Sequence, residues 1–558
     1  MRVAARAVRS APGQTSRSPE PEDAALDAVE LALLVARSQG VCDEMGAILR
    51  RTATSPNIKD RLDFSCALFD PSGALFAQAA HIPVHLGSMA YAMTDLVARF
   101  DWHPGDVVML NDPFLGGTHL PDVTVVVPAF DTAGELLGFA ADRAHHADIG
   151  ADVPGSMPLS TRIEEEGVLI PPMRLQTAAG ITDDALRVFA RLLGEPGAPQ
   201  TAARQPDAWQ RAPRLADFAA QLSAARAGAE GLVALARDFP SSAAFREAVA
   251  ALDAWAFRSA QQALAELPVG RFEADDELEG DGAAIELHVA IDVCRDADGA
   301  TEVHVDFAGS SPQLPSNLNC PLPVTAAAVL YAFRGLMAAG TPAVAGAFRS
   351  IRITAPEGSL LNARRPAAVA AGNVETSMRI VDLVLRALAL ALPERIPAAA
   401  QGSMNNVAMG ARGARRWDYY ETLAGGHGAH AGGPGLSARH AHMTNTLNTP
   451  VESLEAHYPL RVERYALRRG SGGRGRHHGG DGVERSYRFL EDAEVTLIGE
   501  RRRRGPWGLA GGDAGAPGEH ELNGIAVAGR AQLSVEAGDL LTIRTPGGGG
   551  WGPADDST

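Results

Sequence analysis

A β-hairpin signal constrains the fold of this chain more than any other segment. Residues 123–130 and 136–144 are two apolar runs of strand length, and a segment with Asp131 and Gly134 separates them. Apolar runs joined by a short turn-forming segment are typical of antiparallel hairpins. We therefore expect an antiparallel sheet in the N-terminal part of the chain.

A His-x-x-Asp motif lies on each side of this hairpin: His119 and Asp122 precede it, and His145 and Asp148 follow it. Opposed residues in an antiparallel hairpin have a constant sum of residue numbers, and that sum is the same for Asp122 with His145 as for His119 with Asp148. Each pair is thus expected face to face, with about 5 Å between its Cβ atoms. Zinc, iron(II) and manganese accept imidazole and carboxylate ligands, so the four side chains predict a metal site. The alternative is that the Asp residues stabilise turns and the His residues face solvent.

Two further residues lie close to these motifs. Asp63 stands at the start of the apolar segment 64–69, where it is either a further metal ligand or a strand-end residue paired with Arg61. His146 should point to the opposite face of its strand from His145, where a histidine more often supports a ligand or packs.

Four other histidines are candidates for substrate binding. His81 and His85 flank an Ile-Pro-Val segment and either line a pocket or pack beside apolar strands. His427 and His430 lie in a glycine-rich segment whose backbone freedom suits a loop that closes over an anionic or amide substrate. A purely structural loop is the alternative.

The charge and composition exclude several classes of protein. The chain has 67 acidic against 50 basic side chains and a net charge of −17, which argues against a nucleic-acid partner. Its one lysine, Lys59, does not end a phosphate-binding loop. No segment approaches the roughly 18 to 20 apolar residues that span a bilayer, so we expect no membrane association. The four cysteines form no Cys-x-x-Cys pair, which favours a reducing cytoplasm.

The apolar periodicity predicts an α+β fold in a large chain of several lobes. We expect a hairpin-based metal site in the N-terminal part, an Ala-rich helical middle with breaks at Pro196, Pro206 and Pro240, and a loop-rich C-terminal β region. The expected division is a disordered tail at 1–22, an α+β metal-site domain at 23–200, a helical segment at 201–268 and an α+β domain with glycine-rich loops at 269–558. Short strands are predicted near 495–499 and 540–545.

Several motifs resemble those of the hydantoinase B/oxoprolinase family, which includes ATP-dependent hydantoinase, 5-oxoprolinase and acetone carboxylase chains. The resemblance covers about residues 23–553 and departs at 207–232 and 344–349. It is carried by Asn111-Asp-Pro-Phe-Leu-Gly-Gly-Thr-His-Leu-Pro-Asp122, by Ala144-His-His-Ala-Asp-Ile-Gly150, and by residues 55–65, 81–89, 166–172, 355–362, 372–377, 401–406, 442–446, 458–463 and 546–550.

The resemblance implies a B subunit that acts with a hydantoinase A-type ATPase subunit in a hetero-oligomer. The partner would bind ATP and phosphorylate the substrate, and this chain would hold one divalent metal, zinc, manganese or iron, through His119, Asp122, His145 and Asp148. The substrate would be a cyclic amide such as a hydantoin or 5-oxoproline, attacked at its carbonyl carbon by a metal-activated water. Asp63 or His146 would be the base or proton shuttle.

Two alternatives stay open at this point. One is an alpha-type subunit of an ATP-dependent ketone carboxylase, which would join an activated ketone to bicarbonate. The other is a non-catalytic scaffold that completes the ATPase subunit.

Overall fold

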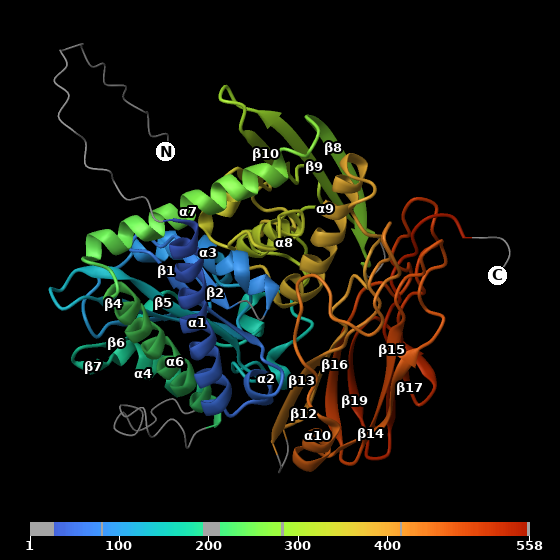
Figure 1. Cartoon of the computed structure of the whole chain (residues 1–558). Helices are drawn as coiled ribbons and strands as arrows, with labels where there is room; N and C mark the ends of the chain where they lie inside the picture. The colour runs from blue at the N-terminus through green and yellow to red at the C-terminus, as the bar shows by residue number, and fades with distance from the viewer. Residues whose placement is uncertain (1–26, 80–81, 194–212, 281–283, 413–415, 555–558) are drawn as a thin grey trace.

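The computed structural model describes residues 27–79, 82–193, 213–280, 284–412 and 416–554. The predicted tail and His81 lie outside these ranges, as do Pro196 and Pro206. The fold is α+β with several sheets, as the sequence predicts (Figure 1).

The N-terminal part is built on one seven-stranded sheet with the order β2-β1-β5-β4-β3-β6-β7. The predicted hairpin forms its centre as β4 and β5, and both strands are buried almost throughout. The strands are β1 (Phe64–Phe69), β2 (Leu75–Ala79), β3 (Val107–Leu110), β4 (Asp122–Phe130), β5 (Leu136–His145), β6 (Met173–Thr177) and β7 (Gly180–Ile181).

Helices cover both faces of this sheet, because successive strand residues point to opposite sides and both sides are apolar. Helices α1 (Ala28–Thr52) and α6 (Pro213–Ala236) pack on one face, and α3 (Pro83–Val97) packs on the other (Figure 1). Helix α6 approaches α1 closely at Gly228, where an added Cβ would lie 2.3 Å from Met45 Sδ. Along the chain, α4 (Asp183–Leu193) precedes α6 and α7 (Ser242–Leu264) follows it. The predicted break at Pro240 separates α6 from α7.

The middle of the chain adds a four-stranded sheet, ordered β11-β10-β9-β8, and two buried helices. Helix α8 packs against α3, and α9 packs against α8 and the strands β8 and β9. A π-helical turn at Gly372–Thr376 leads into α9. The bounds are β8 (Gly270–Leu278), β9 (Ile285–Arg295), β10 (Thr301–Asp306), β11 (Ile351–Thr354), α8 (Leu322–Arg334) and α9 (Ser377–Ala391).

Two further sheets form the C-terminal part, with the orders β13-β12-β16-β19 and β14-β15-β20-β17-β18. The predicted short strands correspond to β16 and β20, whereas most of the other strands here were not predicted. The bounds are β12 (Asn406–Ala411), β13 (Trp417–Thr422), α10 (Val451–His457), β14 (Leu460–Arg468), β15 (Gly482–Phe489), β16 (Ala493–Ile498), β17 (Glu519–Leu522), β18 (Ile525–Val527), β19 (Arg530–Val535) and β20 (Leu540–Arg544).

The glycine-rich segments of this part contact one another through their backbones. Gly548 donates its N–H to the carbonyl oxygen of Gly480 at 2.9 Å and accepts from the N–H of Gly473 at 2.8 Å. A Cβ on Gly548 would lie 1.9 Å from the carbonyl oxygen of His427, so only glycine permits this backbone contact.

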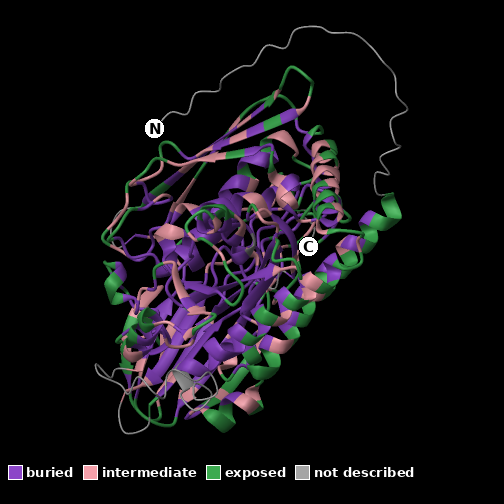
Figure 2. Ribbon diagram, turned by 90° about the vertical axis from the view of Figure 1, so that its left-hand side faces the viewer, coloured by how far each residue is buried: buried purple, intermediate pink, exposed green. Residues whose placement is uncertain are grey.

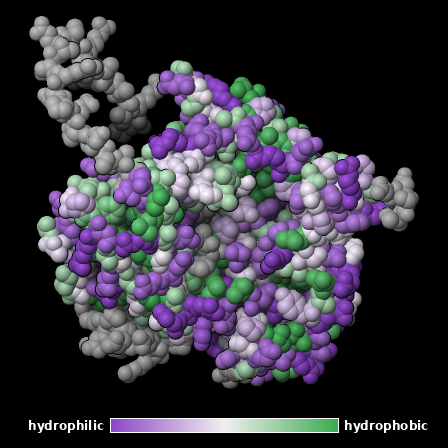
Figure 3. Space-filling model, viewed as in Figure 1, coloured by the Kyte–Doolittle hydropathy of each residue, from purple (hydrophilic) through white to green (hydrophobic). Residues whose placement is uncertain are grey.

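One buried core joins the N-terminal sheet to α8, α9 and β12, and a separate core lies between the two C-terminal sheets. Figure 2 shows buried residues filling the middle of the molecule, with most exposed residues at its edges. The face seen in Figure 3 is mostly polar, with small separate hydrophobic groups. Among the described residues, no helix is long and apolar enough to cross a membrane.

Candidate metal centre

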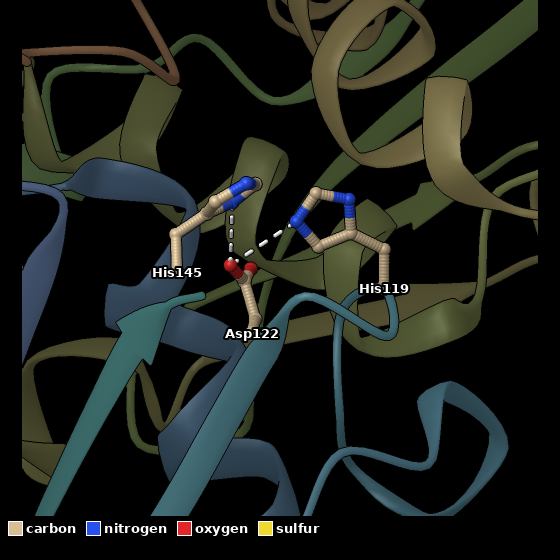
Figure 4. A group of neighbouring side chains, drawn as sticks. All are labelled: His119, Asp122 and His145. Carbon is tan, nitrogen blue, oxygen red and sulfur yellow. Dashed lines mark ion pairs between the residues drawn. The ribbon is translucent and has the colours of Figure 1, made fainter. Parts of the chain in front are cut away.

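The hairpin places Asp122 directly opposite His145, as its register predicts. The pairing stays in this register as far as Ala129 opposite Gly138 and shifts only next to the turn. Asp122 is the first residue of β4 and His145 is the last of β5, so both lie at the open end of the hairpin. His119 reaches the same place from the loop just before β4 (Figure 4).

These three side chains form a compact buried cluster (Figure 4). Asp122 Oδ1 lies 3.1 Å from His119 Nε2 and 3.2 Å from His145 Nδ1. One ligand-type atom from each residue lies within 4.8 Å of the other two, and no side chain of the three is more than 4% exposed. Two imidazole nitrogens and one carboxylate oxygen are a ligand set that zinc, iron(II) and manganese accept.

The cluster leaves polar atoms that no protein group satisfies. Both ring nitrogens of His119, Oδ1 of Asp122 and Nε2 of His145 are buried without a hydrogen-bond partner. Buried polar atoms are almost always hydrogen-bonded, and each one left unpaired costs about 1–3 kcal/mol. The contacts of Asp122 Oδ1 are short but not aligned as hydrogen bonds, so these residues fit a divalent cation that lies among them.

The second oxygen of Asp122 is held by outer partners. Its Oδ2 accepts a hydrogen bond from Thr118 Oγ1 at 2.5 Å and lies 3.2 Å from His85 Nε2. The other ring nitrogen of His85 lies 3.2 Å from Ser65 Oγ. His85, predicted to bind substrate, therefore orients the carboxylate of the cluster, which is how metal ligands are commonly supported.

The cluster keeps a negative charge on Asp122 and a neutral imidazole at His145. Burial by itself would raise the pKa of Asp122, but the neighbouring His119 and His85 outweigh it and hold this pKa well below its usual range. Burial likewise opposes the charged form of His119, yet Asp122 raises the pKa of this imidazole. Burial lowers the pKa of His145. The carboxylate is thus ionised, and His145 is held in the neutral form that binds metals.

Asp148 differs from the sequence expectation, because the structure does not bring it to the cluster. Strand β5 ends at His145, so the register that would place Asp148 opposite His119 does not continue. The carboxylate of Asp148 instead lies 2.9 Å from Arg416 Nη2 and accepts the backbone N–H of Gly150 at 2.9 Å.

His146 lies on the other face of the sheet from the cluster, as strand alternation predicts. Its Nε2 is 2.8 Å from Gln221 Oε1, and its ring contacts Phe218 with 4.5 Å between the ring centroids. Gln221 and Phe218 both belong to α6. The structure therefore does not place His146 where a base for the cluster would have to lie.

Asp63 lies beside the cluster but is not one of its three members. Its Oδ2 is 3.8 Å from Arg61 Nη2, so the pairing considered from the sequence is present. Asp63 also lines a small cavity of about 20 Å³ together with Asp122, His145 and His85. A cavity of this size holds one ion or one water, and no cyclic amide.

The C-terminal part closes this small cavity, and the sequence did not predict that Tyr420 would lie there. Tyr420 of β13 stacks on His145, with 4.9 Å between the ring centroids and 8° between the planes. The Tyr420 hydroxyl donates to Asn406 Oδ1 at 2.7 Å, and the Arg61 guanidinium lies over the Tyr420 ring. The alternation of residues 417–422 could have predicted a strand, but no signal in it names a partner in the N-terminal sheet.

The histidines of the glycine-rich segment lie in a second, larger cavity. His427 and His430 line a cavity of about 750 Å³, and Thr444 lines both this cavity and the small one. The structure thus brings these two predicted substrate residues together, in a space that adjoins the cluster.

The fold and the cluster define the class first: a large α+β protein with a buried group of three residues that could hold a metal ion. The chain belongs to the hydantoinase B/oxoprolinase family, whose sequence model matches residues 27–554. It is 37% identical to an uncharacterized protein of Methanocaldococcus jannaschii over 94% of this chain and 91% of that protein. It is also 37% identical to 5-oxoprolinase 1 of Arabidopsis thaliana, over 94% of this chain but only 42% of that one.

The fold is also that of a solved enzyme structure. The ATP-dependent caprolactamase from Pseudomonas jessenii superposes with a TM-score of 0.84 at 26% identity, over 95% of this chain and 91% of that one. The chain spans less than half the length of 5-oxoprolinase 1, so the remainder of that relative has no counterpart in it.

Proposed function

We propose that this chain is the metal-dependent subunit of an ATP-dependent enzyme that opens cyclic amides. The observation that carries the proposal is the buried cluster of His119, Asp122 and His145, with ligand atoms within 4.8 Å of one another and without hydrogen-bond partners. Two relatives are named for 5-oxoproline and caprolactam, which are both cyclic amides.

The residues of the cluster then have separate roles. A divalent ion held by His119, Asp122 and His145 supplies Lewis acidity toward a carbonyl oxygen and a lowered pKa for water. His85 and Thr118 fix the carboxylate of Asp122, and Tyr420 covers His145 and excludes bulk water. Asp63, paired with Arg61, is the one carboxylate besides Asp122 among the described residues that line this cavity, and we assign it the role of proton acceptor, since His146 lies on the other face of the sheet.

A separate ATPase subunit completes the proposed enzyme. Amides resist attack by water, and transfer of a phosphoryl group to the amide oxygen makes the carbonyl carbon electrophilic. Lys59 does not end a phosphate-binding loop, and this chain corresponds to 42% of 5-oxoprolinase 1. ATP is therefore expected to bind a hydantoinase A-type partner in a hetero-oligomer.

The test is a double variant, His119→Ala with Asp122→Ala, co-purified with its ATPase partner. We expect the wild type to contain about one divalent metal per chain by elemental analysis, and the variant to lose both the metal and the ATP-dependent opening of 5-oxoproline, hydantoin or caprolactam. Full activity in a metal-free variant would contradict the proposal. A requirement for bicarbonate, with a ketone as substrate, would identify a carboxylase instead.

A further inference from the structure

The larger cavity, which we call the chamber, adjoins the small cavity beside the cluster, because Thr444 lines both. The chamber has a volume of about 750 Å³ and lies between the C-terminal end of α8, the segment after α9 and two C-terminal loops. One wall segment is shared with the small cavity: His442, Thr444 and Asn445 line the chamber, whereas Met443 and Thr446 line the small cavity, with Thr444 common to both. The two cavities therefore meet at residues 442–446, so a ring bound in the chamber lies next to the small cavity of the cluster.

The chamber is lined by arginine and has no carboxylate among its described lining residues, although the chain as a whole carries a net charge of −17. Its described lining includes two arginines and four histidines but no aspartate or glutamate. Arg395 is neutralised by an ion pair with Glu266. Arg334 has no carboxylate partner among the described residues and donates only to the carbonyl oxygens of Ala338 and Thr341, at 3.3 and 2.8 Å.

Arg334 thus brings one uncompensated positive charge to the chamber. Its guanidinium has five N–H donors in a planar fork, of which these two contacts use only part. Burial lowers the pKa of Arg334, which means that the cation has lost part of its hydration. A partly desolvated cation gains most from a direct anionic partner.

The remaining wall suits a neutral ring with an amide group. Leu336, Met337, Leu385 and Ile396 provide apolar surface. Burial lowers the pKa of His440 to about 3, so this imidazole is neutral; its Nδ1 lies 3.3 Å from Thr444 Oγ1, and its buried Nε2 has no hydrogen-bond partner and can bind one amide group.

We propose that the chamber holds the cyclic amide, and that it selects an amide with an anionic group, a carboxylate or a phosphoryl, which Arg334 binds. This inference rests on the proposed function and names its substrate class. The anionic group is either part of the substrate itself or the phosphoryl group placed on it by the ATPase partner. A neutral amide would leave the charge of Arg334 without a partner.

The experiment is isothermal titration of the full chain, treated with a chelator, with two ligands that share one ring. 5-Oxoproline carries a carboxylate and 2-pyrrolidinone does not. We expect the wild type to bind 5-oxoproline at least ten times more tightly, and Arg334→Gln to reduce this preference to less than twofold. Arg258→Gln, which removes an exposed arginine of α7 outside the chamber, is the matched control and should keep the full preference.

Titration with inorganic phosphate separates the two sources of the anion. The wild type could bind phosphate, lose this binding in Arg334→Gln, and show no preference between the two lactams. That result would assign the site to the phosphoryl group. The proposal would be overturned if the wild type bound neither lactam and no phosphate. It would also be overturned if Arg334→Gln bound these ligands as the wild type does. The metal content of Arg334→Gln should equal that of the wild type. A negative result for the chamber can therefore be told apart from a negative result for the metal centre.

Discussion

The imidazole of His145 lies flat against the ring of Tyr420, with 4.9 Å between the centroids and 8° between the planes. His145 ends a strand of the N-terminal sheet, and Tyr420 belongs to a strand of a C-terminal sheet. The hydroxyl of Tyr420 is itself fixed by Asn406. The orientation of one predicted metal ligand is therefore set by the other half of the chain.

Truncation of Tyr420 should weaken metal binding without removing a ligand. We expect Tyr420→Ala to lower metal affinity about 10- to 100-fold, because His145 loses the ring that fixes its plane. The same change should cost about 3–5 kcal/mol of unfolding free energy, as for other buried aromatic residues. Tyr420→Phe keeps the stack and should lie close to the wild type in affinity. Competition with a chromophoric chelator and urea unfolding measure the two effects, and equal affinity in all three proteins would refute the role of the stack.

Replacement of His145 and replacement of Asp148 should have different effects on the amount of bound metal. His145→Ala is expected to remove the bound metal, because it deletes one of three converging ligand atoms. Asp148→Asn should retain the metal within twofold, because its carboxylate pairs with Arg416 instead. Elemental analysis of both purified variants measures their metal content. Loss of metal from Asp148→Asn would show that Asp148 is a metal ligand after all.

His85→Ala tests the support of Asp122. Without His85, Asp122 Oδ2 keeps the hydrogen bond from Thr118 at 2.5 Å but loses its second contact, and the carboxylate is free to turn. We expect metal affinity to fall about 10- to 100-fold while the stoichiometry at saturating metal stays at one. Calorimetric titration with zinc and manganese reads both quantities, and an unchanged affinity would show that His85 only packs.

The buried pair Glu375 and Glu500 should make the protein less stable as pH rises. Burial, with the neighbouring charge of Glu500, raises the pKa of Glu375 to about 8, and burial raises that of Glu500 to about 7. The unfolded chain releases these protons near pH 4.5, so the folded state binds more protons between that pH and about 8. This contribution to stability is full below pH 4.5 and is lost as pH rises through 7 to 8.

Glu375→Gln should remove much of the dependence of stability on pH, because the glutamine amide does not titrate. Urea unfolding at pH 5, 6, 7 and 8 compares the wild type with the variant, and the difference between the two isolates Glu375 from the other titrating groups. Parallel curves for the two proteins would show that Glu375 is not buried in its neutral form.

The N-terminal half of the site could be predicted from the sequence because its geometry is local. The register of one hairpin places Asp122 opposite His145, and this pairing needs only a short turn. The same rule failed for Asp148, since it assumes that the strands continue, whereas β5 ends at His145. The extent of a strand depends on backbone hydrogen bonds that the apolar pattern does not specify.

The contacts of the C-terminal half with the cluster could not be predicted, because its strands are short and their partners are distant. Tyr420 meets His145, and Thr444 lines both cavities, only after two C-terminal sheets have formed. The glycine-rich segments that support these loops contact one another through backbone atoms, which leave no side-chain pattern to recognise.

The cavity beside the cluster, at about 20 Å³, has a consequence for the timing of metal exchange. A hydrated divalent cation is larger than this space, so an ion must shed its water and the wall must open before the ion can pass. The rate of metal release would then be set by how often the chain opens, and not by the strength of the bonds between the ion and its ligands. Metal captured during folding would persist through a purification, and its identity would record the ions present when the chain folded.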